Sequence, residues 1–166
     1  MANFGVQLLS ASVTSTFRSA GVIYVSTNAA NLRRINAYEI NVGQVAAAYA
    51  NTDTSMLWDV SRIGASASLA STLVTPNPMD GTAIAAALST YSSLVTAEAV
   101  VTTQGNGLSL YSWPINQRGF NRWRALDDGD NIVVPAVTQN GLAIRMLCPG
   151  GTQAFSAIGT LAFGEG

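Results

Sequence analysis

The strongest constraint on this chain is the regular recurrence of turn-forming residues between short segments rich in β-branched and aromatic side chains. Glycine, proline, asparagine and aspartate favour turns, because they supply unusual or fixed φ angles or local side-chain hydrogen bonds. The clearest turn signals lie at 104–107, 127–131, 139–141 and 149–151. Their separation of about 10 to 15 residues favours strands joined by turns over strands alternating with helices. The chain is therefore predicted to be all-β, an antiparallel β-sandwich or jelly roll.

Two segments show the period of two that a half-buried strand requires. Their apolar residues on one face are Leu142, Ile144 and Met146 in the first segment, and Met56, Trp58 and Val60 in the second. The opposite faces carry Arg145 in the first, and Asp59 and Ser61 in the second. Strands are predicted at 21–26, 35–42, 55–62, 69–74, 108–115, 120–126, 131–137, 141–147 and 157–163.

The N-terminal segment 4–9 is predicted as a further strand, in its own subunit or exchanged with a neighbour, and residues 1–20 as an extended arm. An alanine-rich stretch after Pro78 departs from the strand pattern. It suits a short helix over 82–94, with Asp80 or Thr82 as N-cap, or a long extended connection. We see neither an internal repeat nor a linker, so residues 1–166 are interpreted as one domain.

The composition favours self-association. Hydrophobic residues make up 48% of the chain and charged residues 10%, whereas an average soluble domain carries about 25% charged residues. Burial against other subunits would reconcile so few charges with solubility. All eight basic residues are arginine, which suits interfaces better than lysine; codon bias in a GC-rich genome is the alternative explanation.

Several function classes find no support in the sequence. Histidine is absent, and the single cysteine, Cys148, follows an apolar run as a small buried hydrophobe would. We therefore name no catalytic residue, no metal ligand and no cofactor, and we expect the protein not to be an enzyme. No basic stripe or long apolar run is present, so neither nucleic acid nor a membrane is expected as partner. Without the basic start of a secretion signal, synthesis in the cytoplasm is expected.

Three acidic residues, Asp127, Asp128 and Asp130, surround Gly129. Carboxylates at this spacing suit a Ca²⁺ site, but the alternating ligands and terminal glutamate of an EF-hand loop are missing. A tight turn between two strands is the alternative, and we favour it.

The segment 113–124 is the most distinctive, with three arginines and two tryptophans. On a strand, Arg122 and Arg124 share one face and Trp123 takes the other. Arginine and tryptophan are enriched among interface hot spots, so Arg118, Arg122, Arg124 and Trp113 are proposed interface residues. In the alternative interpretation Trp123 lies in the core and the arginines lie on a solvated face.

A series of short patches between Arg33 and Glu165 resembles small virion structural proteins of tailed bacteriophages, most closely capsid decoration (cement) proteins. The patches are 33–34, 38–40, 42–43, 58–62, 75–80, 116–118 with Phe120 and 122–123, 133–136 and 163–165. The resemblance implies a jelly roll that forms homotrimers on the capsid surface, binds the major capsid protein and stabilises the head of a phage assembled in the host cytoplasm. It supplies no catalytic residue.

Two alternatives stay open. The first is a receptor- or glycan-binding head domain of a phage fibre or tail protein, for which Tyr111 and Trp113 are the candidate contacts. The second is a glycan-cleaving enzyme. It would need a pair of carboxylates, and the chain offers nine acidic residues in all.

Overall fold

The computed structural model describes residues 2–9, 15–26, 28–46, 55–64, 72–79, 90–93, 109–116, 118–149 and 155–166. The strands are β1 (Ala2–Leu9), β2 (Arg18–Tyr24), β3 (Ile35–Ala46), β4 (Ser55–Ile63), β5 (Thr72–Val74), β6 (Asn77–Pro78), β7 (Thr90–Ser93), β8 (Tyr111–Asn116), β9 (Asn121–Arg124), β10 (Ile132–Val134), β11 (Gly141–Leu147) and β12 (Phe155–Glu165). One 3₁₀ turn, Ala29–Asn31, lies between β2 and β3. Within the described residues no helix is long and apolar enough to cross a membrane.

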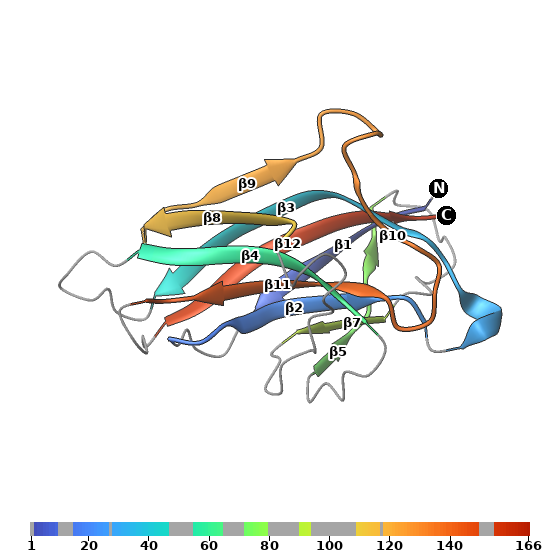
Figure 1. Ribbon diagram of the computed structural model, residues 1–166, viewed down its shortest axis with the longest axis horizontal. Coiled ribbons are helices and arrows are strands. Elements are labelled where there is room, and N and C mark those ends of the chain that lie inside the picture. The colour runs from blue at the N-terminus through green and yellow to red at the C-terminus, as the bar shows by residue number, and fades with distance from the viewer. Residues whose placement is uncertain are drawn as a thin grey trace.

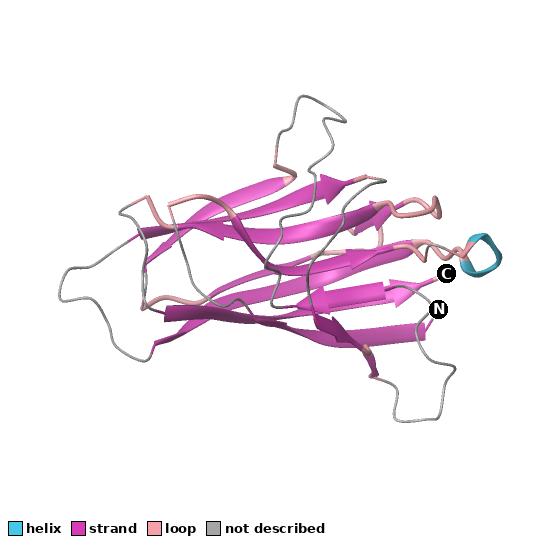
Figure 2. Cartoon of the chain, turned by 90° about the horizontal axis from the view of Figure 1, so that it is seen from below, coloured by secondary structure: helices cyan, strands magenta, loops and turns pink. Residues whose placement is uncertain are grey.

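The strands form two sheets that pack face to face (Figures 1 and 2). The first sheet has the order β10-β3-β12-β1-β6, with β9 also paired to β3. The second has the order β5-β7-β2-β11-β4-β8. Every pairing between the described strands is antiparallel. The predicted all-β antiparallel sandwich is therefore confirmed.

The core lies between the two sheets, where inward side chains of both meet in one cluster. Its largest members include Phe4, Leu8, Ile40, Trp58, Ile144, Met146, Leu161 and Phe163. The rings of Phe4 and Phe163 stack with centroids 5.6 Å apart, which joins the first and last strands. Cys148 is buried in the same cluster, as predicted. Burial of this apolar area is the main favourable contribution to folding.

Several predicted strand bounds shift. β11 has the predicted bounds, whereas β3 and β12 are longer than predicted and β9 and β10 are shorter. β9 ends at Arg124 because a turn follows it, and β10 ends immediately before Pro135, which lacks the N–H that a ladder needs. The pairing of β12 with β3 shifts its register between Ala162 and Phe163, as a β-bulge does.

The strand predicted at 4–9 is confirmed: β1 lies inside the first sheet, paired to β12 along its whole length and to β6 on its other side. Residues 2–9 therefore belong to the sheet and do not project as an extended arm. The predicted helix is wrong at its C-terminal end. Thr90–Ser93, predicted as the end of a helix, is strand β7 between β2 and β5. There the buried Tyr91 donates a 2.7 Å hydrogen bond to the carbonyl of Gln7 in the opposite sheet. The remainder of the predicted helix lies outside the described residues.

The central strands of the second sheet are buried on both faces. Asp59 and Ser61, which the pattern placed opposite the apolar face of β4, are fully buried. On the same side Val22, Ile63 and Ala143 form a second, smaller apolar cluster. The solvent-facing surface described next therefore belongs to the first sheet.

Candidate interaction face

Strand β9 lies at the rim of the first sheet, where Trp123 pairs with Ile40 of β3 and Arg124 with Glu39. Its side chains alternate as predicted. Trp123 packs against the core, with its ring centroid 5.3 Å from that of Tyr111 on β8. Arg122 and Arg124 point to the opposite side and are exposed. Because Trp123 anchors the strand, the two arginines are presented from a fixed backbone.

Both arginines share one carboxylate. Arg122 Nη2 lies 2.8 Å from Glu39 Oε2, and Arg124 Nε lies 3.9 Å from the same atom. The side chains of Arg122 and Arg124 are 49% and 67% exposed, and that of Glu39 is 19% exposed. The hydrogen bond from Arg122 is the main cause that lowers the pKa of Glu39, and the same contact raises the pKa of Arg122. With two guanidinium groups for one carboxylate, the cluster carries a surplus of positive charge.

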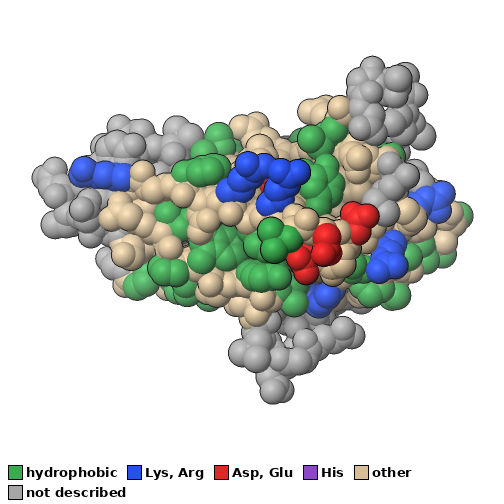
Figure 3. Space-filling model, turned by 90° about the horizontal axis from the view of Figure 1, so that it is seen from above, with side chains coloured by type: hydrophobic (Ala, Val, Ile, Leu, Met, Phe, Trp, Pro, Cys, Tyr) green, Lys and Arg blue, Asp and Glu red, His purple; other side chains and the backbone are tan. Residues whose placement is uncertain are grey.

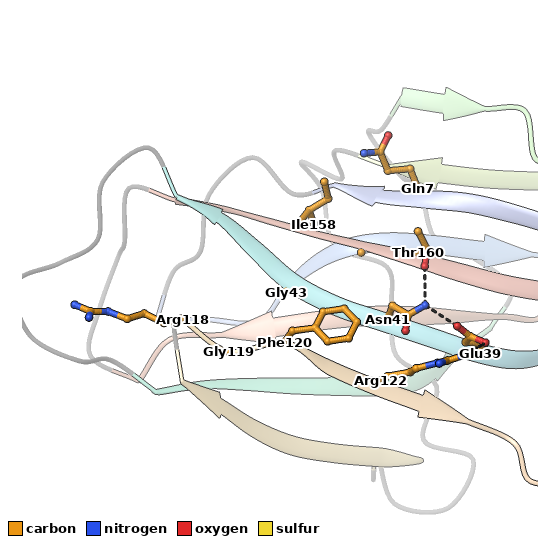
Figure 4. A pocket seen from close by; sticks show the side chains of 11 residues that line it. Gln7, Glu39, Asn41, Gly43, Arg118, Gly119, Phe120, Arg122, Ile158 and Thr160 are labelled. Carbon is orange, nitrogen blue, oxygen red and sulfur yellow. Dashed lines mark hydrogen bonds and ion pairs between the residues drawn. The ribbon is translucent and has the colours of Figure 1, made fainter.

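Beside this cluster a shallow groove of about 790 Å³ crosses the outer face of the first sheet, hereafter the arginine groove (Figure 4). It is lined by Gln7, Glu39, Asn41, Gly43, Arg118, Gly119, Phe120, Arg122, Ile158, Gly159 and Thr160. A smaller hollow of about 410 Å³ continues it toward Met79 and shares Gln7, Glu39, Asn41 and Thr160 with it. Gly43, which contributes to the lining, adds no side chain to the floor beneath Phe120.

The groove combines polar groups with one exposed ring. Asn41 Nδ2 donates to Glu39 Oε1 at 2.8 Å and to Thr160 Oγ1 at 3.0 Å, while Asn41 Oδ1 accepts no hydrogen bond (Figure 4). Phe120 is 67% exposed and lies over Gly43, where an added Cβ would meet the ring at 3.5 Å. A large apolar side chain this exposed above a polar floor is a candidate contact for a partner. Phe120 was not among the predicted interface residues, although it stands between Arg118 and Arg122 in the sequence.

After β9 the chain makes an exposed acidic turn, residues 126–130. Asp127 Oδ1 accepts a 2.7 Å hydrogen bond from the N–H of Gly129, and the N–H of Asp130 donates to the carbonyl of Asp127. The predicted tight turn is therefore confirmed, and among the described residues no three metal-ligating side chains gather. Leu126 is 93% exposed at the start of this turn. Figure 3, seen from the β9 side, shows acidic side chains close to a group of basic ones.

The structure brings three of the four proposed interface residues together. Arg118 and Arg122 line the arginine groove and Arg124 lies beside it. Trp113 does not join them: it lies on β8 of the other sheet, opposite Trp58 in register, and packs partly buried against the core. Tyr111, its companion in the glycan-binding hypothesis, packs on Trp123. Trp113 lies on the face of β8 that points toward the core, and the sequence did not show which face of this strand is buried.

Comparison with known protein families, curated proteins and solved structures finds no match for this chain. The chemistry of the face is therefore interpreted from its own residues. Guanidinium groups bind carboxylates, amide and hydroxyl groups donate and accept hydrogen bonds, and the exposed ring offers apolar contact. Together these groups suit the binding of a partner.

Proposed function

We propose that the protein is a non-enzymatic structural protein of a tailed-bacteriophage virion. It acts as a capsid decoration (cement) protein: it forms a homotrimer, lies on the capsid surface and stabilises the head by binding the major capsid protein. The observation that carries the proposal is the exposed pair Arg122 and Arg124 around Glu39, beside the exposed Phe120. Arginine and aromatic residues are the types most enriched in protein interfaces.

The strand order supports the jelly-roll part of this proposal. Strands β1, β12, β3 and β9 are neighbours in one sheet, and β2, β11, β4 and β8 are neighbours in the other. The chain thus alternates between the sheets as it runs from β1 to β4, and the later strands pair back between the earlier ones. Two antiparallel halves that wrap around each other in this manner are typical of a jelly roll.

The composition supports an assembled state. A chain with 48% hydrophobic and 10% charged residues has few charges to keep a free surface soluble. A specific interface typically removes about 1,600 Å² from water. Repetition of the same contact over a shell converts modest individual affinities into lasting attachment.

The test is co-sedimentation of the purified full chain with DNA-free heads of the phage that encodes it. The wild type is expected to sediment with the heads and to raise their melting temperature. Phe120→Ser with Arg122→Ala is expected to lose both effects, whereas Leu73→Ser, which replaces a 68% exposed leucine on β5, retains them. A wild-type chain that stays in the supernatant at all concentrations contradicts the proposal.

A second candidate function, glycan binding by a receptor-binding head, is favoured by one observation. The arginine groove places the amides of Gln7 and Asn41 and the hydroxyl of Thr160 close to the exposed ring of Phe120. Hydroxyl-rich sugars are recognised by such donors and acceptors together with a ring face. Binding to host-cell glycans that Phe120→Ser abolishes, with no binding to heads, would favour this function over the first.

A further inference from the structure

We infer that the arginine groove receives the acidic turn, residues 126–130, of a second copy of the same chain. This inference rests on the self-association in the proposed function and specifies which two surfaces form the contact. It follows from two surfaces of the same molecule with complementary chemistry: the exposed acidic turn and the arginine groove.

The acidic turn has the properties of an inserting element. Leu126 is 93% exposed, and the three carboxylates of Asp127, Asp128 and Asp130 follow it on exposed residues. Hydrogen bonds from Gly129 and Asp130 to Asp127 fix the loop. A pre-ordered loop loses little conformational entropy when it docks.

The arginine groove offers matching groups. Phe120 and Ile158 supply apolar contact for a leucine side chain. Arg122 lines the groove, and it shares the single carboxylate of Glu39 with Arg124. Two guanidinium groups with one carboxylate leave a net positive charge that an acidic partner can pair with. Guanidinium–carboxylate pairs give both charge attraction and defined geometry. The apolar and the charged parts of the two surfaces therefore correspond.

The acidic turn does not occupy the groove of its own subunit. Arg122 lines the groove, whereas Leu126 and the aspartates are exposed beyond the end of β9 and are not among the residues that line it. A contact between two different surfaces of identical chains is heterologous, and it closes into a ring when the rotation between copies allows. The trimer of the proposed function is such a ring.

Sedimentation velocity of the full chain over a range of concentrations is the first test. Leu126→Ser and Phe120→Ser are each expected to raise the dissociation constant about tenfold or more, since each removes a large apolar contact. Leu73→Ser makes the same substitution at an exposed leucine away from the contact, and it should leave the dissociation constant unchanged. The double variant Leu126→Ser with Phe120→Ser should be little weaker than either single variant, because the two residues share one contact.

Cross-linking tests the pairing directly. Leu126→Cys mixed with Phe120→Cys under mild oxidation should give a disulfide-linked dimer, whereas Leu73→Cys mixed with Phe120→Cys should not. The natural Cys148 is fully buried and stays out of the reaction. Charge reversal at Arg122 and at Asp128 should each weaken association, and their combination should restore it. Higher salt should weaken the wild-type contact.

Three results would overturn the inference: a wild-type chain that is monomeric at every concentration, equal weakening by Leu73→Ser and Leu126→Ser, or a glycan that occupies the groove while Leu126→Ser leaves association intact. These outcomes are separate from failure of the proposed function. A chain that stays monomeric but still binds heads would contradict only the inferred contact. A chain that forms a ring but does not bind heads would contradict only the proposed function.

Discussion

Arg145 on β11 donates a hydrogen bond to the carboxylate of Asp59, which lies directly opposite it on β4 and is fully buried. Ser61 completes the arrangement: its hydroxyl donates to Asp59 Oδ1 at 2.5 Å and accepts from Arg145 Nη2 at 2.9 Å. The guanidinium also lies 4.5 Å from the ring centroid of Phe17. The opposite charges offset the cost of burying each other, although Arg145 Nε finds no hydrogen-bond partner among the described residues.

Loss of either partner should therefore be costly. Asp59→Ala is expected to lower the free energy of unfolding by about 3–5 kcal/mol, because it leaves the guanidinium of Arg145 buried without its counter-charge. Asp128→Ala, on the exposed acidic turn, should change the free energy of unfolding of the dissociated subunit by less than about 0.5 kcal/mol. Urea denaturation of both variants measures the difference. Similar losses for the two would show that the buried pair does not stabilise the fold.

Trp123 and Arg124, neighbours on β9, should differ in the same assay. Trp123→Ala is expected to cost about 3 kcal/mol, the lower end of the range for large aromatic truncations, because Trp123 is partly rather than fully buried. Arg124→Ala should cost the isolated fold under about 1 kcal/mol, since its side chain is exposed. Sedimentation should instead show weaker association for Arg124→Ala. An Arg124→Ala variant that associates normally would remove this residue from the interface.

The Glu39 contact should give stability a defined pH dependence. The pKa of Glu39 is lowered, chiefly by the hydrogen bond from Arg122. Its contribution is therefore fully present above the ordinary glutamate pKa and is lost as the pH falls through the lowered value. The difference in unfolding free energy between wild type and Glu39→Gln should be constant near neutral pH and vanish at lower pH. A difference that grows on acidification would contradict the assigned pairing.

Chelators and reductants should leave the fold unchanged. Asp127 already accepts a backbone hydrogen bond within the acidic turn, and Cys148, the single cysteine, has no intrachain partner. Melting curves recorded with EDTA or with dithiothreitol should overlay the untreated curve. A large decrease of the midpoint with EDTA would reveal a structural cation at Asp127, Asp128 and Asp130.

Alternation and turn chemistry made much of the sandwich predictable. β11 was located residue for residue, since its apolar residues recur every second position between glycine and proline signals. The side of β9 that carries the arginines was also correct, because Trp123 and its neighbours alternate. In both cases the alternation in the sequence matches the side of the strand that is buried in the fold.

Features that depend on long-range pairing were missed. Nothing in the local pattern of Thr90–Ser93 reveals that Tyr91 reaches the carbonyl of Gln7 across the core. Asp59 was assigned to a polar face because its partner, Arg145, is 86 residues away in the sequence. The arginine groove joins residues of β1, β3, β9 and β12 with the loop before β9, so the role of Phe120 emerges only from the assembled sheet.

The proposed structural role on a phage head is tested most directly by cryo-electron microscopy of particles purified from the source that encodes this chain. The account predicts density for the β-sandwich on the outer surface of the capsid, in trimers at regular positions, with Arg122 and Phe120 buried at contacts. Particles whose capsid carries no such density, while the chain is present in infected cells, would contradict it.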